Sequence, residues 1–179
     1  MRKKRTYDIV LISFTAALLA VCSWITVPAG AVPFTMQTFG VFVAALLLGE
    51  IKGTVSVIVY ILLGAVGLPV FSSFQSGVGV ILGATGGYLL GFVFITLIGG
   101  FFSRKFSDNT VLTFLGLTLG LIVCYVAGTA WFMIVYLDSA QSVSVLSVLA
   151  SCVFPYILPD IVKMALAVAV AKKVKGRIL

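Results

Sequence analysis

The sequence predicts an all-α integral membrane protein: a single membrane domain over residues 1–179, built as a six-transmembrane-helix bundle with both termini in the cytoplasm. Composition is the first reason, because 61% of the residues are hydrophobic and 9% are charged, against about a quarter in soluble domains. The second is a series of apolar stretches near the length of about 20 residues that crosses a bilayer as a helix. The third is the placement of the cations between those stretches.

Six apolar stretches are the expected membrane spans. The first follows the basic residues 2–5, and its apolar run is too long for a secretory signal. The second and third are short, so a tilted or re-entrant element near Pro33 is an open alternative. The six expected spans are residues 7–27, 34–48, 54–68, 78–102, 110–137 and 143–171.

The cations predict the orientation of the bundle. Lys and Arg flank membrane spans on the cytoplasmic side, so the segments that hold them are expected inside and the chain is expected to be a multi-pass protein of the cell membrane. The net charge of +7 therefore reports contact with the lipid bilayer and no nucleic-acid partner. Eleven of the twelve cations lie in segments that six spans leave on one side: Arg2, Lys3, Lys4, Arg5, Lys52, Arg104, Lys105, Lys172, Lys173, Lys175 and Arg177.

Several kinds of chemistry are excluded by the residue inventory. The chain has no histidine and five acidic residues, of which Asp8, Glu50, Asp108 and Asp138 lie at or near span ends, so we expect no metal site. It has no G-x-x-x-x-G-K-[ST] sequence, so it is not expected to bind ATP through a P-loop of its own. We expect no cofactor. The three cysteines have no C-x-x-C spacing and are interpreted as small buried residues.

Small residues at helical spacing predict close helix packing, which drives association where lipid offers no hydrophobic contrast. One such pair, Ala16 and Ala20, lies on the first span and is weak evidence alone. Two longer stripes are expected to pack the fourth and fifth spans: Gly83, Gly87, Gly91 and Gly99 on one, and Gly116, Gly120, Cys124 and Gly128 on the other.

Asp160 and Lys163 place two charges about one helical turn apart inside the last apolar stretch. Each charge in hydrocarbon costs roughly 2.5–3.5 kcal/mol on insertion scales, so such residues usually face a polar cavity or each other. Counting back from Lys172 at 1.5 Å per residue puts Lys163 about 14 Å into the membrane. Pro155 and Pro159 precede the pair and predict a bend in the helix. A cavity floor and a structural ion pair both remain open.

Two outer loops, residues 27–39 and 67–77, combine turn formers, hydrogen-bonding side chains and aromatics without any charge. They are expected to form either ordinary membrane-interface loops or a lid over a small, flat, partly polar ligand.

Four runs in register make the sequence resemble the BioY family. They are residues 32–38 (VPFTMQT), 64–71 (GAVGLPVF), 82–92 (LGATGGYLLGF) and 159–163 (PDIVK). That family comprises the biotin-specific substrate-binding (S) components of energy-coupling-factor transporters. The resemblance implies a six-helix S-component that binds biotin from outside and works with a separate transmembrane coupling protein and two ATPase subunits.

The resemblance also implies a set of functional residues. The family's aspartate and lysine on the last helix map onto Asp160 and Lys163, and its small-residue pair that docks the coupling protein maps onto Ala16 and Ala20. Lys163 would meet the carboxylate or the ureido oxygen of biotin, and Asp160 a ureido N–H. Packing against the rings is expected from Phe34, Phe71, Phe74, Tyr88 and Tyr156, and extra hydrogen bonds from Thr35 and Gln37.

One departure and two alternatives accompany this interpretation. Many members carry an arginine in a glycine-rich loop after the GLPVF run, whereas this chain has none there, and Gln75 or a serine is the expected substitute. An S-component or solute carrier for another small vitamin would share the topology. An intramembrane aspartyl protease would need two carboxylates within the spans, and only Asp160 lies deep in one.

Overall fold

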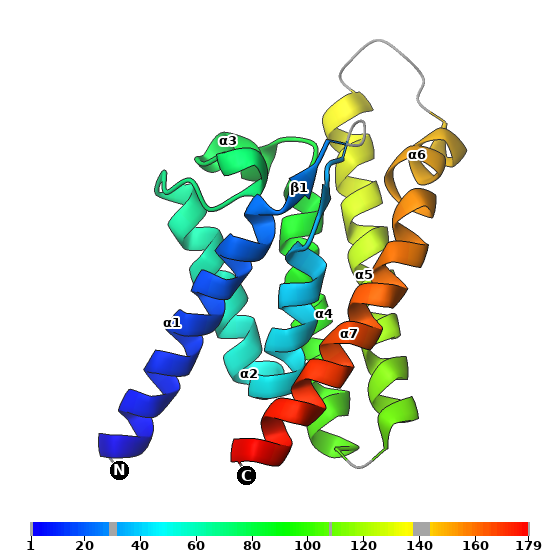
Figure 1. The fold of residues 1–179 in the computed structure, drawn as a ribbon. Helices are drawn as coiled ribbons and strands as arrows, with labels where there is room; N and C mark the ends of the chain where they lie inside the picture. The colour runs from blue at the N-terminus through cyan, green and yellow to red at the C-terminus, as the bar shows by residue number, and fades with distance from the viewer. Residues whose placement is uncertain (1, 29–31, 108, 138–143, 179) are drawn as a thin grey trace.

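The computed structural model describes residues 2–28, 32–107, 109–137 and 144–178 as a helical bundle with one small β-hairpin (Figure 1). Five of its helical stretches, Thr6–Trp24, Gln37–Ala65, Gly86–Lys105, Thr110–Val135 and Val145–Lys175, are long and apolar enough to cross a membrane. The elements are α1 (Arg2–Trp24), β1 (Thr26–Val27), β2 (Phe34–Thr35), α2 (Gln37–Ala65), η1 (Ser72–Phe74), α3 (Val78–Leu82), α4 (Gly86–Lys105), α5 (Thr110–Leu137), α6 (Val145–Cys152) and α7 (Phe154–Ile178).

Helix α2 folds back on itself at Gly49, which has φ 74° and ψ −172°. In a straight helix Gln37 and Tyr60 would lie about 34 Å apart. The Gln37 Nε2 atom instead donates to the Tyr60 hydroxyl at 2.6 Å. Figure 1 shows the two arms, residues 37–48 and 50–65, descending and rising side by side. These arms correspond to the expected short spans 34–48 and 54–68, with three of the four boundaries shifted by three or four residues.

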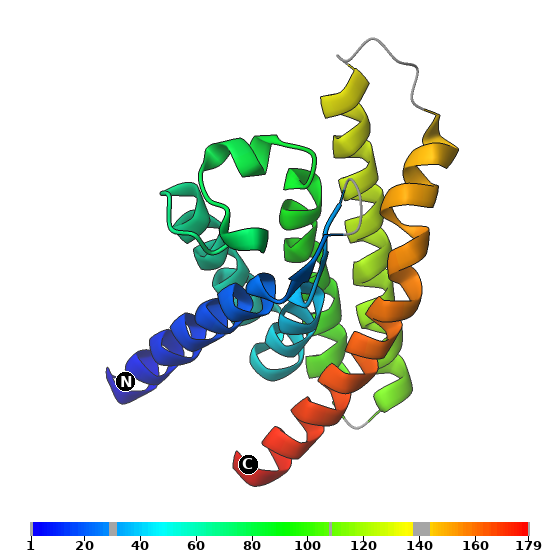
Figure 2. The same ribbon diagram turned by 45° about the horizontal axis from the view of Figure 1, so that its top comes forward.

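A β-hairpin takes the place of the tilted or re-entrant element considered near Pro33. Helix α1 ends at Trp24, and β1 pairs antiparallel with β2, Thr26 opposite Thr35 and Val27 opposite Phe34. Val32 precedes Pro33, and the residue before a proline is disfavoured in helical conformation, so the chain is extended there. The expected spans 7–27 and 34–48 are therefore wrong at the ends that form these strands. Figure 2 shows the hairpin between the end of α1 and the side of the bundle formed by α5 and α7.

Two other expected spans are interrupted, whereas the span expected at 110–137 is α5. The stretch 78–102 divides into α3 and α4, because the chain doubles back so tightly that a Cβ on Gly86 would lie 1.6 Å from the Ile81 carbonyl oxygen. The stretch 143–171 divides at Val153 (φ −124°, ψ −57°), two residues before Pro155. This break confirms the bend expected ahead of the charged pair; Val143 lies outside the described residues.

The glycine stripes pack closely, as predicted, and they do so by bringing α4 against α5. A Cβ on Gly91 would lie 2.6 Å from the Cys124 Sγ atom, and one on Gly120 would lie 2.8 Å from the Ile95 Cα atom. Such distances leave no room for a side chain, so the two backbones approach as closely as the small residues allow. Gly83 precedes α4, and its carbonyl oxygen accepts a hydrogen bond from the Trp131 indole at 3.0 Å.

Both chain ends lie at the same end of the bundle (Figure 1). Two ion pairs lie toward this end: Lys52 with Asp8 and Arg104 with Glu50, each at 2.5 Å between nitrogen and oxygen. They join α1 to α2 and α2 to α4. Asp108 and Asp138, also expected near span ends, lie outside the described residues.

Candidate binding site

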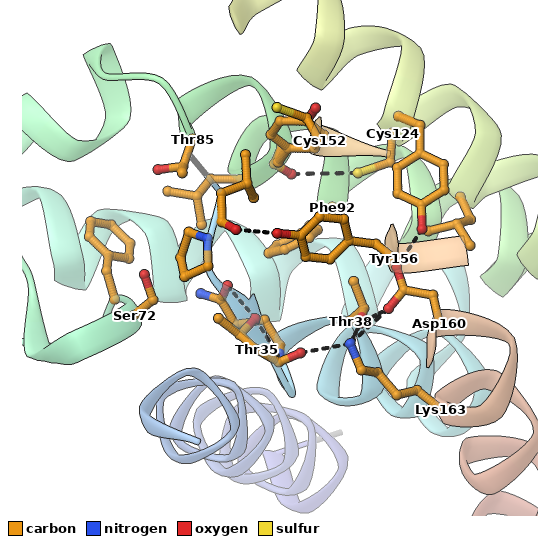
Figure 3. Close-up of a pocket in the computed structure, with 18 of the residues that line it drawn as sticks. Thr35, Thr38, Ser72, Thr85, Phe92, Cys124, Cys152, Tyr156, Asp160 and Lys163 are labelled. Atoms are coloured by element: carbon orange, nitrogen blue, oxygen red, sulfur yellow. Dashed lines mark hydrogen bonds and ion pairs between the residues drawn. The ribbon is translucent and has the colours of Figure 1, made fainter. Parts of the chain in front are cut away.

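A cavity opens between the hairpin, the first arm of α2 and helices α4 to α7 (Figure 3), with about 70 Å³ available to the centres of water-sized molecules. The lining residues are Val32, Pro33, Thr35, Gln37, Thr38, Phe71, Ser72, Val80, Thr85, Tyr88, Leu89, Phe92, Leu121, Cys124, Tyr125, Cys152, Tyr156, Asp160 and Lys163.

Lys163 and Asp160 form a buried ion pair in the cavity wall, with side chains 5% and 3% exposed. The Lys163 Nζ atom lies 2.8 Å from the Asp160 Oδ1 atom. It also donates to the Thr35 carbonyl oxygen at 2.7 Å and to the Thr38 hydroxyl at 3.1 Å. The first of these bonds ties the hairpin to α7. All three ammonium protons therefore have an acceptor within the chain.

Asp160 is held by two hydroxyl groups besides Lys163. The Thr38 hydroxyl donates to Oδ1 at 2.8 Å, and the Tyr125 hydroxyl donates to Oδ2 at 2.6 Å. A buried ion pair is tolerated when additional hydrogen bonds satisfy its remaining donors and acceptors, and this network supplies them from the hairpin, α2 and α5. Both side chains of the pair are therefore held in fixed positions before any ligand binds.

A second polar group lies beside the first. The Thr35 hydroxyl donates to the Gln37 Oε1 atom at 3.0 Å and accepts from the Gln37 backbone N–H at 3.2 Å. The Gln37 amide nitrogen donates to the Tyr60 hydroxyl on the second arm of α2. Thr35 and Gln37 are thus fixed in place on the cavity wall.

Aromatic side chains make up much of the remaining wall, contributed by Phe71, Tyr88, Phe92 and Tyr156. The Tyr156 hydroxyl donates to the Val32 carbonyl oxygen, which links α7 to the hairpin loop. Phe34 lies next to the pair, with the Lys163 Nζ atom 4.1 Å from its ring centroid. The cavity therefore offers flat apolar faces together with a few fixed polar atoms.

The structure brings seven of the predicted contact residues to the cavity wall: Thr35, Gln37, Phe71, Tyr88, Tyr156, Asp160 and Lys163. Phe34, Phe74 and Gln75 do not line it. Ser73 and Phe74 have φ values of 56° and 60°, and this turn leaves Phe74 62% exposed and stacked on Trp24 at 5.2 Å. Gln75 is also exposed, so it does not take the position of a cavity arginine.

Sequence reasoning did not select two residues that complete the charged network, Thr38 and Tyr125. Thr38 lies three residues after Thr35 in the same polar run, and this proximity could have identified it. Tyr125 carries a hydroxyl group in the middle of an apolar span. Only the packing of α5 against α7 shows that Asp160 is its hydrogen-bond partner. All three cysteines are free and buried, as expected, but Cys124 and Cys152 also line the cavity.

Ala16 and Ala20 lie inside this chain, 2% and 7% exposed. They belong to the main hydrophobic core, on the face of α1 where Leu19 and Cys22 meet Gly40 of α2. A groove that admits a partner needs an outward face, and Ala17 lies on that face. The alanine pair therefore packs the chain's own core in this structure.

A model of the BioY family matches residues 1–178. The chain belongs to the BioY family. It is 38% identical over 169 residues to "Probable biotin transporter BioY" of Pyrococcus horikoshii, covering 94% of this chain and 96% of that one. It is 37% identical over 159 residues to "Biotin transporter BioY" of Thermotoga maritima, covering 89% and 90%.

A solved structure has the same fold as this BioY family member. It is the crystal structure of the S-component for biotin from an ECF-type ABC transporter, with a TM-score of 0.86 and 25% sequence identity. The match covers 98% of this chain and 94% of that one, so the similarity in fold extends over nearly the whole chain.

Proposed function

We propose that this chain is a high-affinity biotin-binding membrane subunit that mediates biotin uptake together with an ATP-driven energy-coupling module. The observation that carries the proposal is a small-molecule cavity built around a buried, fully hydrogen-bonded Asp160–Lys163 pair in a member of the BioY family. Relatives named as biotin transporters support biotin as the ligand.

The proposed topology has six spans with both termini in the cytoplasm. The two arms of α2 count as separate spans, because the chain reverses at Gly49. The other four are α1, α4, α5 and the combined α6 and α7. Both termini and the ion pairs of Lys52 and Arg104 lie toward one end, and a cation-rich end is typical of the cytoplasmic side of the cell membrane.

In the proposed complex, biotin lies in the cavity with its rings between Phe71, Tyr88 and Tyr156. The Phe34 ring packs against the Lys163 ammonium group. Thr35 and Gln37 supply hydrogen-bonding atoms at fixed positions. Biotin suits this wall because it combines a neutral ureido ring, an apolar sulfur ring and an aliphatic tail. A binding role rather than catalysis is proposed, since Asp160 is the sole carboxylate among the described lining residues.

The proposed partners are a transmembrane coupling protein and two ATPase subunits. The ECF-type ABC transporter that contains the similar S-component supports a separate energy source, and this sequence has no P-loop of its own. A docking role for Ala16 and Ala20 rests on the family resemblance, and their burial means that docking there requires α1 to separate from its own core.

Calorimetry on the purified protein in detergent, without nucleotide, tests the proposal. Saturable heat at micromolar or lower biotin is expected, because the wall is preorganised and binding needs no energy source. Heat with a different vitamin and none with biotin would overturn the proposal in favour of another S-component. A mass spectrum of the small molecules released from the protein as purified provides an independent check.

A further inference from the structure

The hydrogen bonds of the charged pair restrict which end of a ligand it receives. An ammonium has three donors, and those of Lys163 all have acceptors on Thr35, Thr38 and Asp160. A carboxylate has about four acceptor positions, and three of those on Asp160 are taken, two at Oδ1 and one at Oδ2. What remains is one acceptor position at Oδ2. The pair is therefore complementary to a ligand N–H.

The charge balance of the buried pair also favours a neutral ligand group with N–H donors. A ligand carboxylate at this position would put two carboxylates around one ammonium in a buried site, and like charges at close range disfavour each other. A neutral ring with N–H donors adds no charge and leaves the pair balanced. Of the two ends of biotin, the ureido ring has N–H groups and the carboxylate has none. The ureido end therefore meets Asp160.

The far side of the cavity offers no cation to the other end of the ligand. Figure 3 shows Ser72 and Thr85 on the side opposite Asp160 and Lys163. Lys163 is the sole cation among the described lining residues, and the other eleven cations of the sequence belong to segments at the end of the bundle where the termini lie. A carboxylate on this side keeps its charge in water rather than in an ion pair, because burying it unpaired is costly.

We infer that the cavity recognises the ureido and sulfur rings and leaves the carboxyl group free to be extended, so that its substrate class includes biotin esters and amides, among them biotin joined to the side-chain amine of lysine. This inference rests on the proposed function. A neutral or elongated tail loses no ion pair, and the side lined by Ser72 and Thr85 presents it with hydroxyl groups and no charge.

Competition calorimetry with the purified full chain tests the inference against four ligands. Biotin, biotin methyl ester and ε-biotinyl-lysine are expected to bind within about threefold of one another. 2-Iminobiotin, in which a guanidine replaces the ureido group, is expected to bind at least tenfold more weakly at a pH where it is charged. Failure of biotin itself to bind would overturn the proposed function. Normal biotin binding with at least tenfold weaker ester and amide binding would overturn this inference alone.

A cation added on the hydroxyl side provides a second test. Thr85→Lys is expected to raise the preference for biotin over its methyl ester at least threefold, because the free carboxylate gains a partner that the ester lacks. Leu82→Lys, at an exposed position that does not line the cavity, is the matched control for net charge and should leave the ratio unchanged. An unchanged ratio in Thr85→Lys, with biotin still bound, would show that the tail points elsewhere and would overturn the assigned orientation.

Discussion

Two lysine–aspartate pairs in this molecule have nearly the same geometry and opposite surroundings. Lys52 and Asp8 meet at 2.5 Å with side chains 43% and 33% exposed, whereas Lys163 and Asp160 meet at 2.8 Å with 5% and 3% exposed. The first pair ties α1 to α2 near the end that holds the termini. The second lies in the cavity wall, with hydroxyl partners on both members and a backbone carbonyl partner on Lys163.

The contrast shows that burial, rather than distance, decides what an ion pair does. Water and salt screen the exposed pair, and such pairs contribute about 0–1 kcal/mol. The buried pair has lost that solvent, so each charge depends on its partners, and removal of one member typically costs about 3–5 kcal/mol. The Lys52 pair therefore fastens two helices, whereas the Lys163 pair determines the chemistry of a site.

Lys163→Ala is expected to have the largest effect. It leaves Asp160 as an unpaired buried carboxylate, so thermal unfolding in detergent should show a loss of about 3–5 kcal/mol. Biotin binding, measured by calorimetry, should weaken at least tenfold, because Asp160 loses the partner that holds it in place for a ligand N–H, and a hydrogen bond to a charged group is worth about 1.5–3 kcal/mol. Lys163→Met, which keeps an apolar stem, should fold but bind poorly. Normal binding by both variants would make the pair purely structural.

The double variant Asp160→Asn/Lys163→Met is the control for this prediction. It removes both charges, so much of the lost stability should return, because replacing both members of a buried pair is often nearly neutral. Binding should not return with it. A double variant as unstable as Lys163→Ala would mean that shape rather than charge caused the loss.

Tyr125→Phe is expected to come next, because it removes the hydroxyl that donates to Asp160 while keeping the ring. A hydrogen bond to a charged group is worth about 1.5–3 kcal/mol, so the unfolding temperature should fall less than in Lys163→Ala. Tyr7→Phe, at an exposed position on α1, is the matched control and should change nothing. If the two phenylalanine variants behave alike, Asp160 does not depend on Tyr125.

Ala16→Trp and Ala17→Trp extend the comparison from charge to volume. Ala16 is buried and its neighbour Ala17 is exposed on the same helix. Overpacking a core costs about 1–3 kcal/mol, so Ala16→Trp should lower the unfolding temperature and Ala17→Trp should not. Uptake assays with the coupling module should then show whether an indole on the outer face blocks docking. Full stability in Ala16→Trp would place that alanine on an outward groove after all.

Lys52→Gln is expected to have the smallest effect, within about 1 kcal/mol and reduced further at high salt. Thermal unfolding at two salt concentrations checks it, with biotin affinity unchanged because the pair lies outside the cavity lining. A loss as large as that of Lys163→Ala would erase the distinction between the two pairs.

The sequence predicted the features of the fold that depend on composition and on small residues. Apolar length located the helices, and glycine spacing predicted that the fourth and fifth spans pack closely, without identifying them as each other's partners. The hairpin could not be predicted, because strands of two residues carry no alternation. The split between α3 and α4 lies inside one predicted span and depends on the tight turn at Gly86, so the mean hydropathy of that span does not reveal it.

The site also divides into residues that local sequence predicts and residues that depend on tertiary packing. Asp160 and Lys163 were predictable because charges inside an apolar span are costly and usually face a polar cavity or each other. Loop composition selected Phe71 correctly as a cavity residue but could not separate it from Phe74, whose direction depends on the positive φ values of Ser73 and Phe74. Tyr125 reaches Asp160 across 35 residues of sequence, and such a contact follows from helix packing that no local pattern encodes.

The folded-back α2 has a consequence for how far a bound molecule still has to travel. The first arm, residues 37–48, is about 18 Å long at 1.5 Å per residue, little more than half of a hydrocarbon core of about 30 Å. Thr38, near its start, bonds both members of the charged pair. In the proposed orientation the cavity floor therefore lies near mid-depth, and a ligand seated there lies close to the boundary between the two leaflets. Only the length of one short helical arm separates it from the cytoplasm.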